Sequence, residues 1–484
     1  MYFDCCRSGR RRALCLLPLL ILQASCAIYA PAPRSHSDLA DVPDAFTDGA
    51  AAEAPADRWW ELLGAPELDA LVEQALDGNL TLAQARARLE QARAEAVVQG
   101  AARLPDLRLE GGAGVARQRL PAATGTESIR TRESYSIGLA SAYELDLWGR
   151  VRSVAEAAAL QREASAEDLD AAAISVAAEV ATRWIALVAQ RQALDVLARQ
   201  LEGNRRVLEL TELRFRQARA SAVDVFQQRE AVARTEALIP LEEARKQTLL
   251  HELAVLAGRP PRSSVESVLR LLPESAPMPP TGLPAELLER RPDVRAAQLR
   301  LSSADWRLSA ARAERLPALR LTGLAQYSDE QLSSLFDDWI GSLAASLTGP
   351  VFDAGRRRAE ADRARAVVDE RLAAYRAVVL QAFLEVEGAL VQERKQAEFE
   401  AALAAQLDAS RLTYREAMER YRNGLTDFLP VLTAEFNMQA AERGLVQARA
   451  DRLRSRVALL RALGGAWPQA PLATEQPADS GDPS

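Results

Sequence analysis

The feature that most constrains this chain is an internal duplication. Residues 79–109 align with residues 291–321 without a gap, and 11 of the 31 positions are identical. A second match places residues 215–218 against residues 421–424. Self-similarity of this kind is typical of tandem copies of one structural unit. The sequence therefore predicts two copies with the same order of elements.

Each copy is predicted to begin with an Ala/Arg/Leu-rich helix, Leu80 to Ala102 in the first copy and Val294 to Arg315 in the second. A Leu-Pro step closes both helices, because proline disfavours a helical conformation at the residue before it. Apolar residues that alternate with polar or small ones then predict four strands of about ten residues, the length that spans an outer membrane when tilted. These strands lie around residues 107–113, 137–147, 319–327 and 343–347.

Four strands in one chain predict an oligomer. An open sheet leaves two edges of unpaired backbone groups, which lipid does not tolerate, and barrels made by a single chain begin at about eight strands. The smallest plausible closure is therefore an oligomer, and three chains of four strands give a trimeric β-barrel of about twelve strands. The alternative is a soluble hairpin packed on helices.

A long helical region is expected after each strand pair, from Val151 to Leu256 and from Arg356 to Leu463. Each region is expected to break near its middle into helices of about 50 residues, each about 75 Å long. Pro240 is expected to bend or interrupt its helix. An apolar residue at every seventh position predicts coiled-coil packing. The series consists of Val180, Leu187, Leu194, Leu201 and Leu208.

Clusters of proline and glycine mark the expected boundaries between segments. Each repeat is expected to contain a helix, a β-hairpin and a long helical hairpin. The expected segments are a lipoprotein signal peptide (1–25), an N-terminal periplasmic segment (26–78), the first repeat (79–258), a Pro-rich linker (259–290), the second repeat (291–465) and a loose C-terminal tail (466–484).

The N-terminus has the three parts of an export signal: a basic stretch at residues 7–12, a short apolar run from Ala13 to Leu22, and small residues before Cys26. Because a small-small-Cys ending is also what a lipoprotein signal has, Cys26 is predicted to be lipidated and to become the new N-terminus. The alternative is an ordinary signal cut near Ala24 or Ala27. No other apolar stretch is expected to approach the roughly 20 residues of a membrane helix.

Composition argues against several classes of function. The net charge is −7 and the basic residues are scattered, so no nucleic-acid partner is expected. All four cysteines lie in the first 26 residues, which leaves no disulfide framework beyond them. The histidines are His36 and His251, and the sequence has no Cys/His cluster and no phosphate-binding glycine loop. The sequence predicts no enzyme, no metal site and no cofactor.

Six short motifs follow one another along the chain. They are Trp59-Trp60 through Asp69 and Asn79-Leu80, Tyr143 to Arg150, Arg290 to Val294, Gly349 to Arg356, and Leu463 to Gly465. With these motifs on a duplicated frame, the chain resembles the outer-membrane factors of tripartite efflux and type I secretion systems. This is the TolC-like family, and the resemblance is greatest to its lipoprotein branch of NodT and OprM type.

The resemblance implies a fold of α-helices plus transmembrane β-strands. It implies a homotrimer in which a twelve-strand β-barrel in the outer membrane continues into a long periplasmic α-helical barrel. It also implies contact with outer-membrane lipid, a periplasmic adaptor (membrane fusion) protein and an inner-membrane pump of the RND or similar type. The expected function is a lipid-anchored channel protomer of the cell outer membrane, a passive conduit that exports small molecules.

Two groups of alternatives stay open. Within the same fold, the alternatives to a channel for small molecules are a type I secretion channel and a metal-efflux channel. From a different class, a periplasmic adaptor or a structural coiled-coil lipoprotein also has long helices and a lipid anchor, but it would form no stable pore.

The resemblance places candidate working residues at the tips of the helical hairpins, where the family closes its periplasmic end with polar links. By position, Asp224 and Tyr421 are expected to meet by a hydrogen bond and act as a latch. The alternative is that Asp224 caps or solvates a helix and that Tyr421 packs between helices.

Two further tip residues complete the candidate gate. Gly424 is expected to supply backbone freedom at the second tip, where an adaptor is expected to bind, and Ala218 stands at the matching position of the first. Asp427 lies near the positions at which some family members ring the pore with aspartates. Pro430 and Thr433 occupy those positions here, which argues against a cation-binding ring.

Overall fold

The computed structural model describes residues 29–32, 34, 46, 58–120, 128–263, 269–274, 278 and 284–464. The predicted signal peptide, the predicted lipidation site Cys26 and the predicted C-terminal tail lie outside these residues. The chain divides into two compact units. The first contains Arg88–Ser165 and Ala296–Arg376, and the second contains Ala166–Arg295 and Ala377–Ser484 together with Ala40–Ala87.

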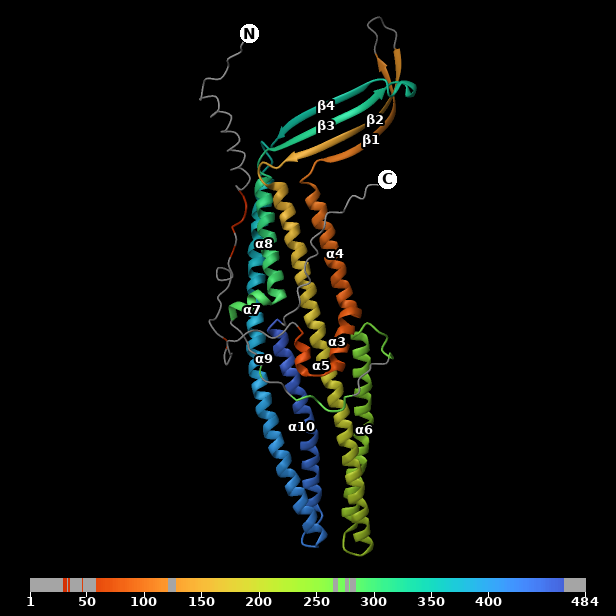
Figure 1. The fold of residues 1–484 in the computed structure, drawn as a ribbon, viewed down its shortest axis with the longest axis vertical. Coiled ribbons are helices and arrows are strands. Elements are labelled where there is room, and N and C mark those ends of the chain that lie inside the picture. Colours follow the sequence, from red (N-terminus) through yellow and green to blue (C-terminus); the bar gives the residue numbers. More distant parts are fainter. Residues whose placement is uncertain are drawn as a thin grey trace, which may run out of the picture. The chain divides into compact units, whose positions relative to one another are not determined.

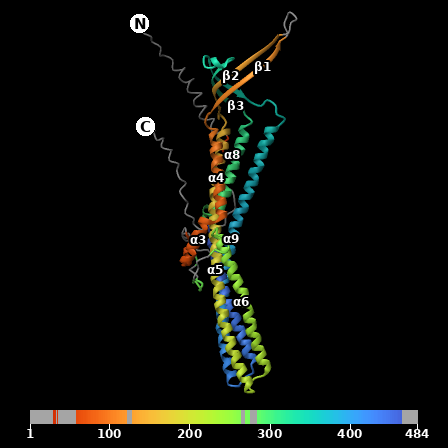
Figure 2. The same cartoon turned by 90° about the vertical axis from the view of Figure 1, so that its right-hand side faces the viewer.

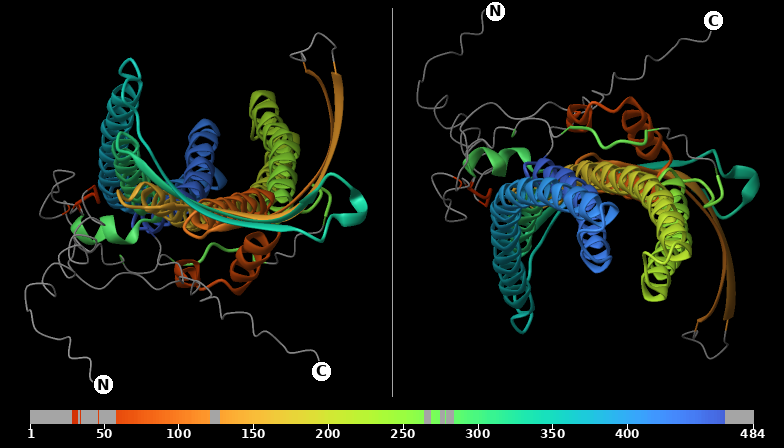
Figure 3. Two further views of the ribbon diagram at one scale, coloured as in Figure 1. Left: turned by 90° about the horizontal axis from the view of Figure 1, so that it is seen from above. Right: turned by 90° about the horizontal axis from the view of Figure 1, so that it is seen from below.

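The first unit contains one four-stranded antiparallel sheet in the order β1-β2-β3-β4 (Figure 1). Leu109, Leu139, Ala325 and Gly341 stand opposite one another and form one row across it. The sheet is a curved band rather than a flat one (Figure 3). Its strands are β1 (Asp106–Leu120), β2 (Ser128–Leu145), β3 (Ala318–Asp329) and β4 (Trp339–Thr348).

The prediction of four strands is confirmed, but the first pair is longer than expected. β1 has 15 residues and β2 has 18, whereas β3 has 12 and β4 has 10. The sequence signal missed this extension because Arg117 and Arg119 of β1 break the alternation of apolar and polar residues, although their backbones continue the ladder.

The duplication is visible in the helices. Helices α4 (Leu80–Ala101) and α8 (Pro292–Ala313) both have 22 residues, and α5 (Arg150–Arg216) and α9 (Arg356–Arg422) both have 67. All four of these helices contribute residues to both units. The Leu-Pro step separates helix from strand, as predicted. Helix α4 ends four residues before Pro105, and β1 begins directly after Pro105.

The two copies share the backbone geometry of the turn that connects the second strand of each pair to the long helix. Gly149 and Gly355, each one residue before the helix, have φ of 77° and 83°, the left-handed region that glycine enters without strain. An aspartate then accepts hydrogen bonds from the first free backbone amides. Asp146 accepts from Arg152 N at 2.7 Å, and Asp353 accepts from Gly355 N at 3.1 Å.

The second unit contains the helical hairpins. α5 turns into α6 (Ala222–Leu256) and α9 turns into α10 (Leu429–Ala462), and the partners of each hairpin run side by side (Figures 1 and 2). Each helical region breaks at the tip segment that the duplication aligns, as expected. The expected halves of about 50 residues are wrong, because the first helix has 67 residues and the returning helix only 35 or 34. The outgoing helix is longer because it also packs in the first unit, where Ser303 of α8 donates to Ala157 O of α5 at 2.8 Å.

Pro240 does not interrupt its helix, since α6 continues from Ala222 to Leu256 with Pro240 inside it. Contacts with α5 hold α6 on both sides of the proline. Before it, the amide of Asn204 lies 2.8 Å from Thr235 Oγ1; after it, Gln190 Nε2 donates to Glu242 O at 2.9 Å. These contacts offset the one backbone hydrogen bond that proline removes.

The main apolar core of the second unit surrounds α5. Val180 and Leu187 of the heptad series are buried, and the three later leucines of that series are half-buried. Trp184 is also fully buried, and its indole donates to Glu67 Oε1 of α3 (Pro66–Gly78) at 2.9 Å. The remaining elements of the described residues are short. They are the 3₁₀ helix η1 (Trp59–Leu63), the helix α7 (Pro284–Arg290) and the 3₁₀ turn η2 (Leu332–Ser334) between β3 and β4.

One helix of the described residues passes the length and composition test for a membrane span. An 18-residue window of α5 has a mean hydropathy of 1.5, so the expectation that no later stretch is apolar enough is wrong. Of this window, 61% is buried inside the structure, as in the core helix of a soluble protein.

In each copy, the side chain of the residue before α4 or before α8 donates a hydrogen bond to the last turn of that copy's final helix. In the first copy, Asn79 Nδ2 donates to Leu256 O, the end of α6, at 2.8 Å, while Asn79 Oδ1 caps α4 by accepting from Thr81 N. In the second copy, Arg291 Nη1 donates to Ala462 O, the end of α10, at 3.0 Å. The two acceptors are 206 residues apart, so the contact is duplicated with a different donor.

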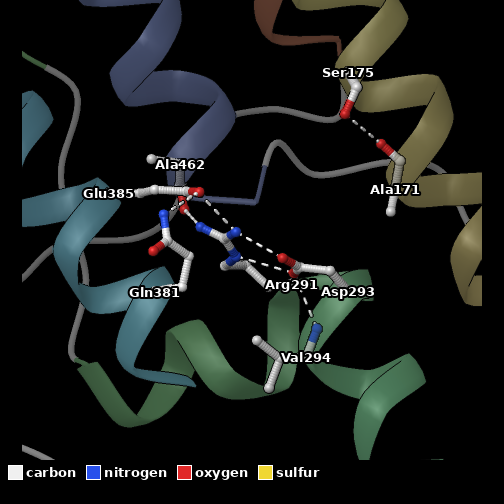
Figure 4. A network of polar contacts seen from close by, with 8 residues as sticks. All are labelled: Ala171, Ser175, Arg291, Asp293, Val294, Gln381, Glu385 and Ala462. Atoms are coloured by element: carbon white, nitrogen blue, oxygen red, sulfur yellow. Dashed lines mark hydrogen bonds and ion pairs between the residues drawn. The ribbon is translucent and has the colours of Figure 1, made fainter. Parts of the chain in front are cut away.

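Arg291 also carries an ion-pair network of its own. It is 7% exposed, and its guanidinium contacts the carboxylates of Asp293 at 2.7 Å and Glu385 at 2.9 Å (Figure 4). A buried guanidinium requires such partners, because burial without them is strongly unfavourable. The network joins α8, α9 and α10 at one point.

The second copy contains a buried ion pair at a place where the first copy is apolar. Arg456 Nη2 of α10 lies 2.5 Å from Glu393 Oε1 of α9, and both side chains are 5% exposed. The matching residues of the first copy, Leu187 and Leu250, belong to its apolar core.

This difference gives a stability prediction. Glu393→Leu leaves Arg456 buried without its main partner and is expected to lower the free energy of unfolding by about 3–5 kcal/mol. The double variant Glu393→Leu/Arg456→Leu copies the first repeat and is expected to recover most of that loss. Thermal melts in detergent, followed by circular dichroism, measure both. Equal melting temperatures for the single and double variants would contradict the assignment.

Candidate functional site at the tips of the helical hairpins

The two hairpins turn with the same backbone geometry. Ala218 and Gly424 adopt left-handed φ of 56° and 72°. The next residue after each donates back to the carbonyl five positions earlier, Arg219 N to Arg214 O and Leu425 N to Arg420 O, both at 2.8 Å. This is a helix C-cap that normally requires glycine, so Gly424 fits its position and Ala218 is strained by about 1 kcal/mol.

The start of α6 is fixed by a capping box. The Ser221 hydroxyl accepts from Asp224 N at 3.2 Å, and the Asp224 carboxylate accepts from Ser221 N at 2.8 Å. This arrangement satisfies two amides that a helix start leaves free, and the negative charge suits the positive end of the helix. Asp224 is thus used within its own hairpin.

Tyr421 lies in a small apolar cluster at the second tip. It is 3% exposed, and its ring lies 5.3 Å from that of Phe428. Val207 of α5 and Val431 of α10 belong to the same cluster. The cluster therefore joins the first hairpin to the second.

Arg214 covers this cluster. Its guanidinium lies 4.4 Å from the centre of the Tyr421 ring, close enough for a cation–π contact, and its Nη1 donates to Arg422 O at 3.1 Å. One side chain of α5 thus holds both the ring and the backbone at the end of α9.

The phenol of Tyr421 stays protonated. Burial raises its pKa, nearby Arg214 lowers it, and the charge of Asp224 raises it again. The phenol oxygen is buried and has no hydrogen bond of ordinary geometry, although Thr211 and Arg214 lie next to it. Tyr421 and Asp224 therefore influence each other electrostatically without a hydrogen bond between them in the single chain.

The structure brings some predicted residues together and separates others. Tyr421 and Gly424 lie in the same turn, Asp224 begins the returning helix of the other hairpin, and Asp427 is exposed. The latch between Asp224 and Tyr421 stays a prediction. The sequence analysis missed Arg214, since nothing in the sequence distinguishes it from other arginines of the helix. Within the described residues, no group of three or more His, Cys, Asp or Glu side chains is placed to hold a metal ion.

Comparison with known proteins now assigns the family. The family model described as "Outer membrane efflux protein" matches residues 71–259 and 283–465. The chain belongs to this family.

Individual relatives are similar over most of their length. The pyoverdine export outer membrane protein OpmQ of Pseudomonas putida is 32% identical over 467 residues, which cover 94% of this chain and 98% of OpmQ. The toluene efflux pump outer membrane protein TtgF of P. putida is 32% identical over 85% of both chains. The solved outer-membrane channel OprN is 32% identical, with a TM-score of 0.84 over 90% of this chain and 99% of OprN.

The predicted fold and function are therefore confirmed. The chain is a protomer of a trimeric outer-membrane efflux channel, in which its four strands form part of a β-barrel and its long helices form part of a periplasmic α-helical barrel. The family and these relatives are channel and transport proteins.

Arg214 gives a test of the tip geometry. Arg214→Met removes the cation–π contact and the hydrogen bond to Arg422 O, together worth about 1–2 kcal/mol. The tip conformation in which these contacts form is expected to become about tenfold less populated. Because the tips are proposed below as the gate, single-channel recording is expected to detect this loss as higher mean conductance. Arg216→Met, which changes an exposed arginine two residues away, is the matched control. Equal effects of the two variants would refute the role given to Arg214.

Proposed function

We propose that the chain is the passive trans-periplasmic conduit of a tripartite system. In this proposal an inner-membrane pump of the RND or similar type delivers small molecules through a periplasmic adaptor, and the channel adds no energy. The observation that carries the proposal is the combination, in one chain, of an open antiparallel sheet and two helices of 67 residues. At 1.5 Å per residue each helix is about 100 Å long, the scale of a periplasmic span rather than of a globular domain.

The sheet supports assembly with two further copies in lipid. β1 and β4 lie at its edges, and each pairs on one side only among the described strands. Its apolar side chains are exposed, with Leu107 at 70% and Leu343 at 86%. Pairing the edges between chains closes the barrel, and outer-membrane lipid covers these side chains.

Lipidation of Cys26 belongs to the same proposal. An acyl anchor fits a protein held at the outer membrane, and it adds to the hold of the barrel. The mass of the mature N-terminal peptide tests it.

The cargo proposed is small organic molecules. The relatives described above are named for export of pyoverdine and for efflux of toluene, and toluene is a small organic molecule. The alternatives are a type I secretion channel and a metal-efflux channel. Substrate choice belongs mainly to the pump, so the channel sequence does not distinguish them.

The tips are the proposed gate. Asp224 and Tyr421 are proposed to form the latch in the assembled channel, where the hairpins of neighbouring copies also meet. Gly424 and Asp427 are proposed to face the adaptor. Supporting this, Gly424 and Asp427 are exposed, whereas Tyr421 is buried.

The first experiment measures the pore and the assembly together. The mature protein, purified in mild detergent, is expected to have the mass of three chains and to conduct ions in planar bilayers. In cells that lack the gene, the wild-type chain is expected to restore efflux of an exported compound. A monomer that does not conduct would overturn the proposal.

The variant Gly424→Asp distinguishes conduction through the pore from binding of the adaptor. Aspartate at a left-handed φ is tolerated, but it adds a charge at the tip. The variant is expected to conduct in bilayers like the wild type, yet to lose binding of the adaptor and efflux in cells. If both binding and efflux stay normal, the adaptor does not contact this turn.

The latch is tested by a double-mutant cycle. Tyr421→Phe removes the donor of the predicted hydrogen bond. Asp224→Asn replaces its charged acceptor with a neutral one, which weakens the bond, while asparagine still accepts in the capping box. Each variant is expected to raise mean conductance, and the double variant is expected to raise it no further. Asp408→Asn, which changes an exposed carboxylate of the same helix, is the control. Additive effects, or none, would exclude the pair as the latch.

A further inference from the structure

A layer of polar side chains lies inside the helical hairpins, where the heptad pattern calls for apolar ones. It joins three helices: α5, α6 and α10. All of its members are at most 8% exposed. They are Asn204, Gln228, Thr235, Glu435 and Gln439.

Asn204 is the centre of the layer. Its side-chain amide lies 2.8 Å from Thr235 Oγ1, 2.6 Å from the Gln439 amide and 3.0 Å from a carboxylate oxygen of Glu435. Gln228 Nε2 donates to the backbone carbonyl of Asn204 at 3.0 Å. Asn204 of α5 therefore contacts both α6 and α10, and connects these two helices to each other.

Two acceptors of the layer have no donor. Oε2 of Glu435 and Oε1 of Gln228 are both buried and without a hydrogen bond, although the two side chains lie against each other. In the part of the chain that the structure describes, no arginine or lysine pairs with Glu435. An unpartnered carboxylate at such a site is strongly unfavourable. A single proton on Glu435 removes the charge and provides a donor for one of the acceptors.

The other groups that face Glu435 do not compensate its charge. From α9, Tyr414 faces it, and burial followed by the charge of Glu435 raises the pKa of this phenol, so Tyr414 stays neutral. From α6, Arg234 lies over the ring of Phe436 at 5.2 Å and pairs with Glu230. From α5 and α10 the neighbours are the amides Asn204 and Gln439, which do not ionise. Burial raises the pKa of Glu435 to about 7, while Gln228 lowers it.

We propose that Glu435 is a proton-operated lock, in which the neutral acid holds α10 against α5 and α6 and loss of its proton loosens this packing. The proposal rests on the channel function proposed above and adds a regulation to its tips. α10 begins at the second tip and α6 at the first, so loosening their contact frees the tips to separate.

The direction of the pH effect follows from linkage. The packed state holds the proton up to about pH 7, whereas a loosened state with Glu435 in water loses it near the ordinary value of 4.5. Proton binding therefore favours the packed state. Its advantage is complete below about pH 4.5 and is lost as the pH rises through about 7. Between pH 5 and pH 8, the ratio of loosened to packed channels is expected to rise by at least about tenfold.

The test compares three trimeric channels in planar bilayers at pH 5 and pH 8. The wild type is expected to open more often at pH 8. Glu435→Gln, which keeps the shape and stays neutral, is expected to remain as closed at pH 8 as at pH 5. Glu416→Gln, an exposed glutamate on α9, is expected to respond like the wild type.

A spectroscopic measurement identifies the group directly. Infrared difference spectra between pH 5 and pH 8 are expected to show loss of protonated carboxyl absorption in the wild type and in Glu416→Gln, and a smaller loss in Glu435→Gln. The loss that remains belongs to Asp170, because burial raises the pKa of this carboxyl to about 6. A pH response that survives in Glu435→Gln overturns the lock, and so does a conducting wild type that does not respond to pH. A wild type that conducts at neither pH removes the channel function on which the lock rests.

Discussion

Every backbone edge that faces lipid must be paired, and this constraint organises the molecule. β1 and β4 each use one edge within the chain, so the other edge of each has to be covered by another chain. The sheet is stable in lipid only when closed, and closure requires more than one copy. The long helices α5 and α9 follow β2 and β4 within a few residues, so every copy that closes the barrel also contributes two long helices. The unpaired outer edges of β1 and β4 are thus what requires several chains to assemble into a channel.

The two copies are alike in backbone and different in chemistry. Where the first copy closes with Asn79, the second closes with Arg291, and where the first packs Leu187, the second buries Glu393 against Arg456. Duplication supplies a pseudo-symmetric frame, and substitution then gives the second hairpin charged contacts with strict geometric requirements. Breaking such a buried pair by removing one partner is costly, whereas its replacement by apolar residues of similar volume is often neutral.

Local signals in the sequence predicted the elements well. The Leu-Pro stops, the alternating strands and the glycines at left-handed φ are short-range features, and each has one structural solution. Lengths were predicted less well: β1 continues past Arg117, and α5 continues well beyond the middle of its region. Both errors arise because tertiary partners, rather than the sequence of the segment, decide where an element ends. Continuation through Pro240 has the same cause. At the tips, the sequence placed Tyr421 and Gly424 in one turn, but Arg214 and the polar layer around Asn204 depend on contacts between distant helices, which periodicity does not reveal.

The apolar window of α5 has a consequence for the biogenesis of the protein. A chain destined for the outer membrane crosses the inner membrane before it folds, and a segment with a mean hydropathy of 1.5 competes there for lateral release into the bilayer. Residues 171–189 contain many alanines together with Glu179 and Arg183, where a membrane helix would have leucines and no charge. The alanine-rich composition with which α5 packs closely against its neighbours therefore also favours passage through the translocation channel over retention in the bilayer.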